Sequence, residues 1–166
     1  MLIVTLPYPV SANRYWRVRV VKGVAMNYVS SEAKAYKEQV GWIVRAAGVG
    51  APLAGRIAID YTLYPKRPQD WQRRARKLGD AWHDNVMCLD LDNAQKVLLD
   101  ALKGVAFDDD KWVRRITAER AEPDGEARIV VRIAQIATVA PQQNLPICAE
   151  SQTRSLQPAL FDPLEV

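Results

Sequence analysis

Two aspartates separated by a single leucine, Asp90 and Asp92, stand where a core element would normally be apolar. In an extended segment, residues two apart project to the same side, so both carboxylates are predicted to face one point while Leu89 and Leu91 face the core. Two such carboxylates repel each other unless a cation or a proton lies between them, and a hard divalent ion such as Mg²⁺ prefers oxygen ligands. The pair therefore predicts a metal site.

Two further groups of residues extend this predicted site. Lys96 follows Asp92 by four residues, one helical turn, and is expected to meet a phosphate. A second acidic group, residues 108–110, follows the predicted helix, and the fold could return it to the pair. Carboxylate-held metal ions neutralise a phosphate, activate water and stabilise a leaving oxygen, so this set favours phosphodiester hydrolysis. An alternative stays open, in which Asp92 only caps a helix and residues 108–110 form a solvated turn.

The elements that position these residues follow from apolar periodicity and turn residues. Strands are predicted at residues 2–6, 56–64, 112–120 and 127–136, and a hairpin around 15–29 with a turn at Lys22 and Gly23. Helices are predicted from Ser30 or Ser31 to about residue 47, and over 93–103 with Asp92 as the cap. The segment 65–87 has no clear period and is expected to be a long basic loop or a short surface helix.

Length and composition limit the class of protein. The 166 residues, 49% of them hydrophobic, suit one globular domain, here expected over residues 1–138. The two cysteines are far apart, which argues against a disulfide framework or a structural zinc site. No stretch approaches the roughly 20 apolar residues of a membrane span, and a cytoplasmic location is expected. Residues 139–166, rich in Pro, Gln, Ser and Thr, are predicted to form a flexible tail.

The folded part is also the basic part of the chain. Up to Ile133 there are 22 Lys and Arg residues against 16 Asp and Glu, a balance compatible with phosphate backbones but not diagnostic of nucleic acid. Basic residues interleaved with tryptophan in the segment 65–87 suit backbone contacts and stacking on an unpaired base. The predicted DNA-contacting residues are Asn13, Arg14, Arg17, Lys66, Arg67, Arg73, Arg74, Arg76 and Lys77.

The spacing Asp90-Leu-Asp-Asn-x-x-Lys96, followed by Asp100-Ala-Leu and then Asp109-Asp110, resembles the signature of the RusA family of Holliday junction resolvases. The opening segment of residues 6–16, LPYPVSANRYW, also looks like that family's. The resemblance implies that Asp90, Asp92 and Asp110 are essential metal-site residues and that Lys96 is catalytic. The choice of Asp110 over Asp109 depends on how the following strand is aligned, and it stays open.

The resemblance further implies an α+β fold with a mixed sheet, here of four to five strands with two main helices. It implies a homodimer that uses Mg²⁺, with Mn²⁺ as a substitute, to make paired symmetric nicks in a four-way DNA junction. The products would be 5′-phosphate and 3′-hydroxyl ends, and a phage or prophage origin would be plausible. The chain departs from shorter members in the basic insertion around residues 68–88 and in its tail.

Other assignments remain open at this point. One is a nuclease selective for flaps or forks, and another is a non-catalytic DNA-binding recombination accessory protein in which the acidic cluster only organises the fold. In the tail, Gln157, Leu160 and Phe161 lie in a sequence that resembles the Gln-x-x-Leu-Phe peptide by which bacterial DNA-processing proteins bind the sliding clamp. A clamp partner is therefore expected, with an incidental apolar pair as the alternative.

Overall fold

The computed structural model describes residues 1–138 of the chain. The predicted tail and its peptide at Gln157, Leu160 and Phe161 lie outside the described residues. Within residues 1–138, no helix is both long and apolar enough to cross a membrane.

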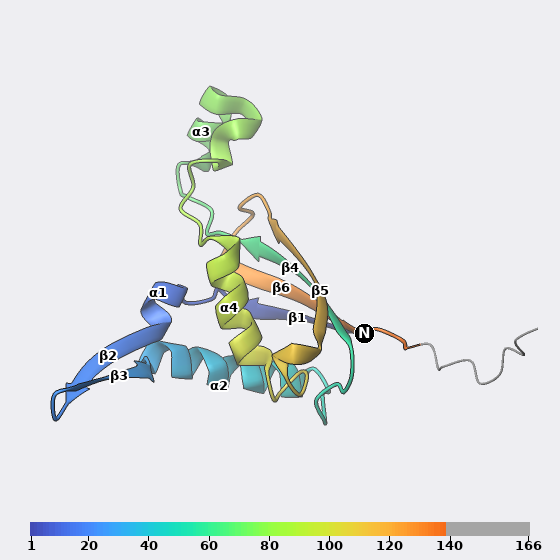
Figure 1. Ribbon diagram of the computed structural model, residues 1–166. Helices are drawn as coiled ribbons and strands as arrows, with labels where there is room; N and C mark the ends of the chain where they lie inside the picture. The colour runs from blue at the N-terminus through green and yellow to red at the C-terminus, as the bar shows by residue number, and fades with distance from the viewer. Residues whose placement is uncertain (139–166) are drawn as a thin grey trace, which may run out of the picture.

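A four-stranded mixed sheet forms the centre of the molecule (Figure 1). Its strand order is β1-β6-β4-β5, with β6 antiparallel to both β1 and β4, and with β4 parallel to β5. The expected α+β class and mixed sheet are thereby confirmed. Residues 121–127 connect β5 to β6 without closing a hairpin, because β4 lies between these two strands. The strands are β1 (Leu2–Pro7), β4 (Ile57–Tyr64), β5 (Val113–Arg120) and β6 (Arg128–Gln135).

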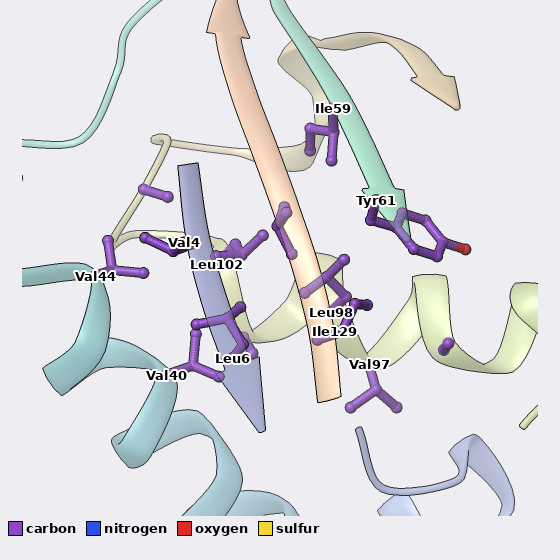
Figure 2. Close-up of a cluster of buried hydrophobic side chains, with 14 of the residues drawn as sticks. Val4, Leu6, Val40, Val44, Ile59, Tyr61, Val97, Leu98, Leu102 and Ile129 are labelled. Atoms are coloured by element: carbon purple, nitrogen blue, oxygen red, sulfur yellow. The ribbon is translucent and has the colours of Figure 1, made fainter. Parts of the chain in front are cut away.

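Two helices, α2 (Ser31–Ala46) and α4 (Leu91–Leu102), pack against each other and against the sheet. Ser30 caps α2 as predicted, since its side chain accepts a hydrogen bond of 3.2 Å from the Ala33 amide. Alternate residues of the strands and the apolar stripes of both helices fill the space between (Figure 2). The core side chains labelled there are Val4, Leu6, Val40, Val44, Ile59, Tyr61, Val97, Leu98, Leu102 and Ile129.

A hairpin projects from one end of the molecule, as Figure 1 shows. It consists of β2 (Trp16–Val21) and β3 (Val24–Val29), and nearly all its residues are exposed. The predicted turn is confirmed, because Lys22 and Gly23 have φ angles of 50° and 79°, which suit a two-residue hairpin loop. A short helix, α1 (Ala12–Tyr15), precedes the hairpin.

The basic insertion forms a second projection, drawn at the top of Figure 1. It contains α3 (Trp71–Leu78) and the 3₁₀ helix η1 (Gly79–His83), so the expected surface helix is present. Trp82, in η1, is buried and donates a hydrogen bond of 3.0 Å from its indole nitrogen to Glu122. This polar anchor ties the projection to the segment that follows β5.

Candidate active site

The predicted pair of carboxylates lies at the N-terminus of α4. The helix begins at Leu91, so Asp90 is the N-cap residue and Asp92 lies in the first turn. The expectation that Asp92 caps a helix starting at Asn93 is wrong, because the chain becomes helical two residues earlier. Asp90 keeps an extended backbone (φ −63°, ψ 142°), and its side chain makes no capping hydrogen bond. Both carboxylates thus share one helix end, although they are not alternate residues of a strand.

The protein itself makes little use of these two carboxylates. Both residues are exposed, and Asp90 accepts one long hydrogen bond of 3.3 Å from the side-chain nitrogen of Asn93. No ion pair within residues 1–138 engages Asp90 or Asp92. Their oxygens are therefore available to a hard divalent cation, and this donor set fits Mg²⁺.

Lys96 lies on α4 one turn beyond Asp92 and on the same face of the helix. Its side chain is exposed and forms no ion pair with the described residues. The ammonium group is consequently available to a phosphate that approaches the N-terminus of α4.

Two tyrosines hold the chain on either side of Asp90. The Tyr61 hydroxyl, from β4, donates a hydrogen bond of 2.7 Å to the Leu91 carbonyl, and the Tyr8 hydroxyl accepts one of 2.9 Å from the Leu89 amide. Burial, and then the negative charge of Asp92, raise the pKa of Tyr61 to about 12. Burial, and then a hydrogen bond with Cys88, raise the pKa of Tyr8 to about 12. Both hydroxyls stay protonated near neutral pH, so they position the backbone and do not act as bases.

Asp110, the third predicted ligand, lies at the opposite end of α4. The Lys103 ammonium, directly after the helix, is 3.0 Å from the Asp110 carboxylate. The 12 residues of α4 span about 18 Å. Within residues 1–138, no three His, Cys, Asp or Glu side chains gather closely enough to hold a metal ion. Within one protomer the structure brings Asp90 and Asp92 together and leaves Asp110 apart, because a rigid helix separates them, and the assignment of Asp110 as the third ligand stays a prediction.

Asp109 and Asp110 differ in how many oxygens they have available. One Asp109 oxygen accepts a hydrogen bond of 3.0 Å from the Lys111 amide at the start of the 3₁₀ helix η2 (Asp110–Trp112), and the other is 2.9 Å from Lys103. The Lys111 amide, and then Lys103, lower the pKa of Asp109 to about 2. Asp110 has only its Oδ1 engaged, by Lys103. This difference favours Asp110 as the residue with oxygens to share.

The predicted DNA-contacting residues divide into paired and unpaired groups. Ion pairs join Arg14 to Glu32, Lys66 to Glu126 and Arg74 to Asp70. The guanidinium of Arg67 stacks over the ring of Trp71, 4.9 Å from its centroid. Asn13, in α1, and Arg17, in β2 of the hairpin, are exposed. Three exposed cations share one face of α3 and form no ion pair with the described residues: Arg73, Arg76 and Lys77.

Comparison with known proteins places this arrangement in a family. A family model for endodeoxyribonuclease RusA matches residues 7–134. The chain belongs to the RusA family. Proteins named crossover junction endodeoxyribonuclease RusA, from Escherichia coli strain K12 and from Escherichia coli O1:K1 / APEC, are each 29% identical over 106 residues. Each match covers 63% of this chain and 68% of the relative. The RusA match spans all of the described elements from α1 to β5, including the carboxylate pair.

As a RusA family member, the chain is an endodeoxyribonuclease, and the prediction of a nuclease is confirmed. Reasoning from the sequence gave no role to Tyr8 or Tyr61, which position the loop and the helix around the carboxylate pair. A signal for Tyr61 was present, because a tyrosine on the buried face of an alternating strand needs a partner for its hydroxyl. The partner itself, a helix carbonyl 30 residues away, follows only from the tertiary structure.

Proposed function

We propose that this protein is a homodimeric, Mg²⁺-dependent endonuclease, with Mn²⁺ as a substitute, that resolves four-way DNA junctions by paired symmetric nicks. The observation that carries the proposal is an exposed carboxylate pair with Lys96 one turn away, in a chain of the RusA family. The matched relatives are named crossover junction endodeoxyribonucleases, which supports a branched substrate. Action in DNA recombination and repair, in a bacterial cytoplasm and from a phage or prophage gene, is part of the same proposal.

Each residue of the site has a distinct role in this mechanism. Asp90 and Asp92 hold the metal, which when bound supplies charge neutralisation at the phosphate and an activated water. Lys96 binds a non-bridging phosphate oxygen and stabilises the negative charge that develops there. The hydrogen bond from Tyr61 fixes the first turn of α4, so that the carboxylates keep their positions as DNA binds.

The third carboxylate, in this proposal, comes from a second copy of the chain. Asp110 is one helix length from Asp90 in its own protomer, so that protomer does not supply it to its own pair. A twofold axis across the middle of α4 would place Asp110 of each copy beside Asp90 and Asp92 of the other. The homodimer would then carry two identical sites, as paired nicks in opposing strands require.

A nicking assay tests the activity. A four-way junction incubated with the protein and Mg²⁺ is expected to yield symmetric nicks with ligatable ends. Asp92→Asn is expected to abolish nicking and to bind the junction at least as tightly, because one negative charge facing the phosphate is removed. Asp80→Asn, at an exposed aspartate of η1, is the matched control and should cut like the parent. Nicking by Asp92→Asn at the parent's rate would refute the mechanism.

Mixing two inactive variants tests the shared site. Asp92→Asn and Asp110→Asn are each expected to be inactive alone. After mixing and subunit exchange, a heterodimer has one site that carries both substitutions and one that is intact. The mixture should therefore regain single nicks without paired cleavage. A mixture that stays inactive although mass spectrometry detects heterodimers would contradict a site shared between copies.

Substrate choice and the tail need their own measurements. Faster cutting of flaps or forks than of four-way junctions would replace the junction assignment with the flap or fork alternative.

Residues 150–166 are proposed to bind the bacterial sliding clamp through Gln157, Leu160 and Phe161. Titration of this peptide with clamp measures the affinity, and binding unchanged by Phe161→Ala would discard the clamp proposal.

A further inference from the structure

A single methionine is presented to solvent close to the carboxylate pair. Met87 lies in the loop between η1 and α4, and 94% of its surface is exposed. Between Gly79 and Leu102, all within the described residues, it is the only exposed large hydrophobic residue. A single exposed apolar side chain is ordinary on a protein surface, so a partner for Met87 is inferred from the residues around it.

The backbone on both sides of Met87 is held in place. Arg120 donates hydrogen bonds of 2.8 Å to the Val86 carbonyl and of 3.0 Å to the His83 carbonyl, and Val86 itself is buried. Two residues beyond Met87, the Leu89 amide donates its hydrogen bond to Tyr8. The exposure of Met87 is therefore a property of a fixed loop, and only its side chain remains to adjust to a partner.

Two hollows meet at Met87. One, of about 540 Å³, is also lined by Lys66, Arg67 and Arg74, and the other, of about 420 Å³, by Lys66 and Arg14. Arg74 pairs with Asp70, Arg14 with Glu32 and Lys66 with Glu126, but the Lys66 and Arg14 side chains keep 70% and 63% of their surface exposed. Cationic walls on both sides of an apolar projection match the chemistry of DNA, which presents phosphates outside a stack of apolar base faces.

The distance to the site is short enough for Met87 to act on the DNA that is cut. Asp90 is three residue steps along the chain from Met87, a span of at most about 11 Å. Successive bases along one strand are about 3.4 Å apart. An apolar contact at Met87 therefore falls within about three base steps of a phosphate held at Asp90.

We propose that Met87 is a wedge that enters the base stack of branched DNA next to the phosphate to be cut. Methionine is among the apolar side chains that proteins insert between base steps, and insertion unstacks and kinks the duplex. The unpaired bases at a branch point are the least costly to separate, so the wedge would favour branched over continuous duplex DNA. This inference rests on the proposed function and adds a positioning residue to it.

Fluorescence of 2-aminopurine tests the wedge. The base analogue is placed at the branch point of a four-way junction, and binding is measured in the Asp92→Asn background to prevent cutting. Binding with Met87 present should raise the fluorescence, because the analogue is unstacked. Met87→Ala should bind with little change in Kd and without this rise, whereas Met87→Leu should keep it. Met26→Ala, at an exposed methionine of the hairpin, is the matched control and should behave like the parent.

Nicking kinetics provide the second readout. With Asp92 intact, Met87→Ala should lower kcat by about tenfold, equivalent to about 1.4 kcal/mol, while KM changes little. An unchanged fluorescence rise in Met87→Ala would overturn the wedge and leave the proposed function standing. Loss of the dimer in Met87→Ala would assign Met87 to a subunit interface and would also overturn it. A parent protein that binds no junction would instead refute the proposed function.

Discussion

Two buried tyrosines provide a matched test of how the carboxylate pair is positioned. Tyr61 and Tyr36 are 2% and 5% exposed, so replacement by phenylalanine removes one buried hydroxyl in each case. The Tyr61 hydroxyl donates to the Leu91 carbonyl at 2.7 Å, at the start of α4. The Tyr36 hydroxyl, in α2, has no hydrogen-bond partner among the described residues. The same chemical change is therefore expected to have opposite effects on stability.

The magnitudes follow from the hydrogen-bond inventory. Tyr61→Phe loses one hydrogen bond and should lower the free energy of unfolding by about 1 kcal/mol. Tyr36→Phe removes a buried polar group without a partner and should raise the free energy of unfolding by about 1 kcal/mol. For a domain of this size, each change corresponds to a shift in Tm of roughly 3 °C. Tyr61→Phe should also lower the nicking rate, because the first turn of α4 loses its anchor.

Urea denaturation and junction nicking measure the two effects separately. Tyr36→Phe should nick at the parent's rate, since Tyr36 lies in α2, away from the N-terminus of α4. Tyr28→Phe, at an exposed tyrosine of the hairpin, controls for the substitution itself and should change stability by less than about 0.5 kcal/mol. If Tyr61→Phe and Tyr36→Phe shift stability in the same direction, the assignment of these two hydroxyls is refuted.

Three further predictions concern charged residues. Lys96→Ala should slow nicking by a larger factor than it weakens the junction Kd; an unchanged rate would remove Lys96 from the mechanism. The pKa of Asp109 is about 2 in the folded protein and higher in the unfolded chain, so its carboxylate stabilises the fold above about pH 4 and loses this effect toward pH 2. In urea denaturation, Asp109→Asn should therefore make the free energy of unfolding vary less with pH over that range. Replacing Arg73, Arg76 and Lys77 by Ala should reduce the slope of log K against log salt by about 3 if all three contact phosphates, and an unchanged slope would exclude α3 from the interface.

Features that lie within a single helix, strand or hairpin could be predicted from the local sequence. The four-residue spacing of Asp92 and Lys96 placed both on one helix face, and α4 has them so. The alternation in the segment 56–64 predicted the buried face of β4, and the turn at Lys22 and Gly23 predicted the hairpin. These patterns depend on neighbours along the chain, which is why they can be read without a fold.

The exact start of a helix and the order of strands in the sheet were harder to predict from the sequence. The start of α4 was placed at Asn93, whereas Asp90 caps a helix that begins at Leu91. Asp90 and Leu91 suit either an extended or a capped conformation, and their contacts with β4 decide between them, because Tyr61 binds the Leu91 carbonyl. Similarly, the predicted strands at residues 112–120 and 127–136 are consecutive in sequence, but β4 lies between them in the sheet, since strand order depends on packing against the helices.

The sequence by itself determined the position of the acidic pair at Asp90 and Asp92, the family, and the helix that presents Lys96, and it predicted the metal chemistry of the pair, because residue types and short spacings carry that information. Only the tertiary structure decided where Asp110 lies relative to them. A rigid helix of 12 residues separates the two acidic groups in one protomer, and Lys103 holds Asp110 at its far end. Residues distant in sequence meet only where the fold, or a second copy of the chain, brings their elements together.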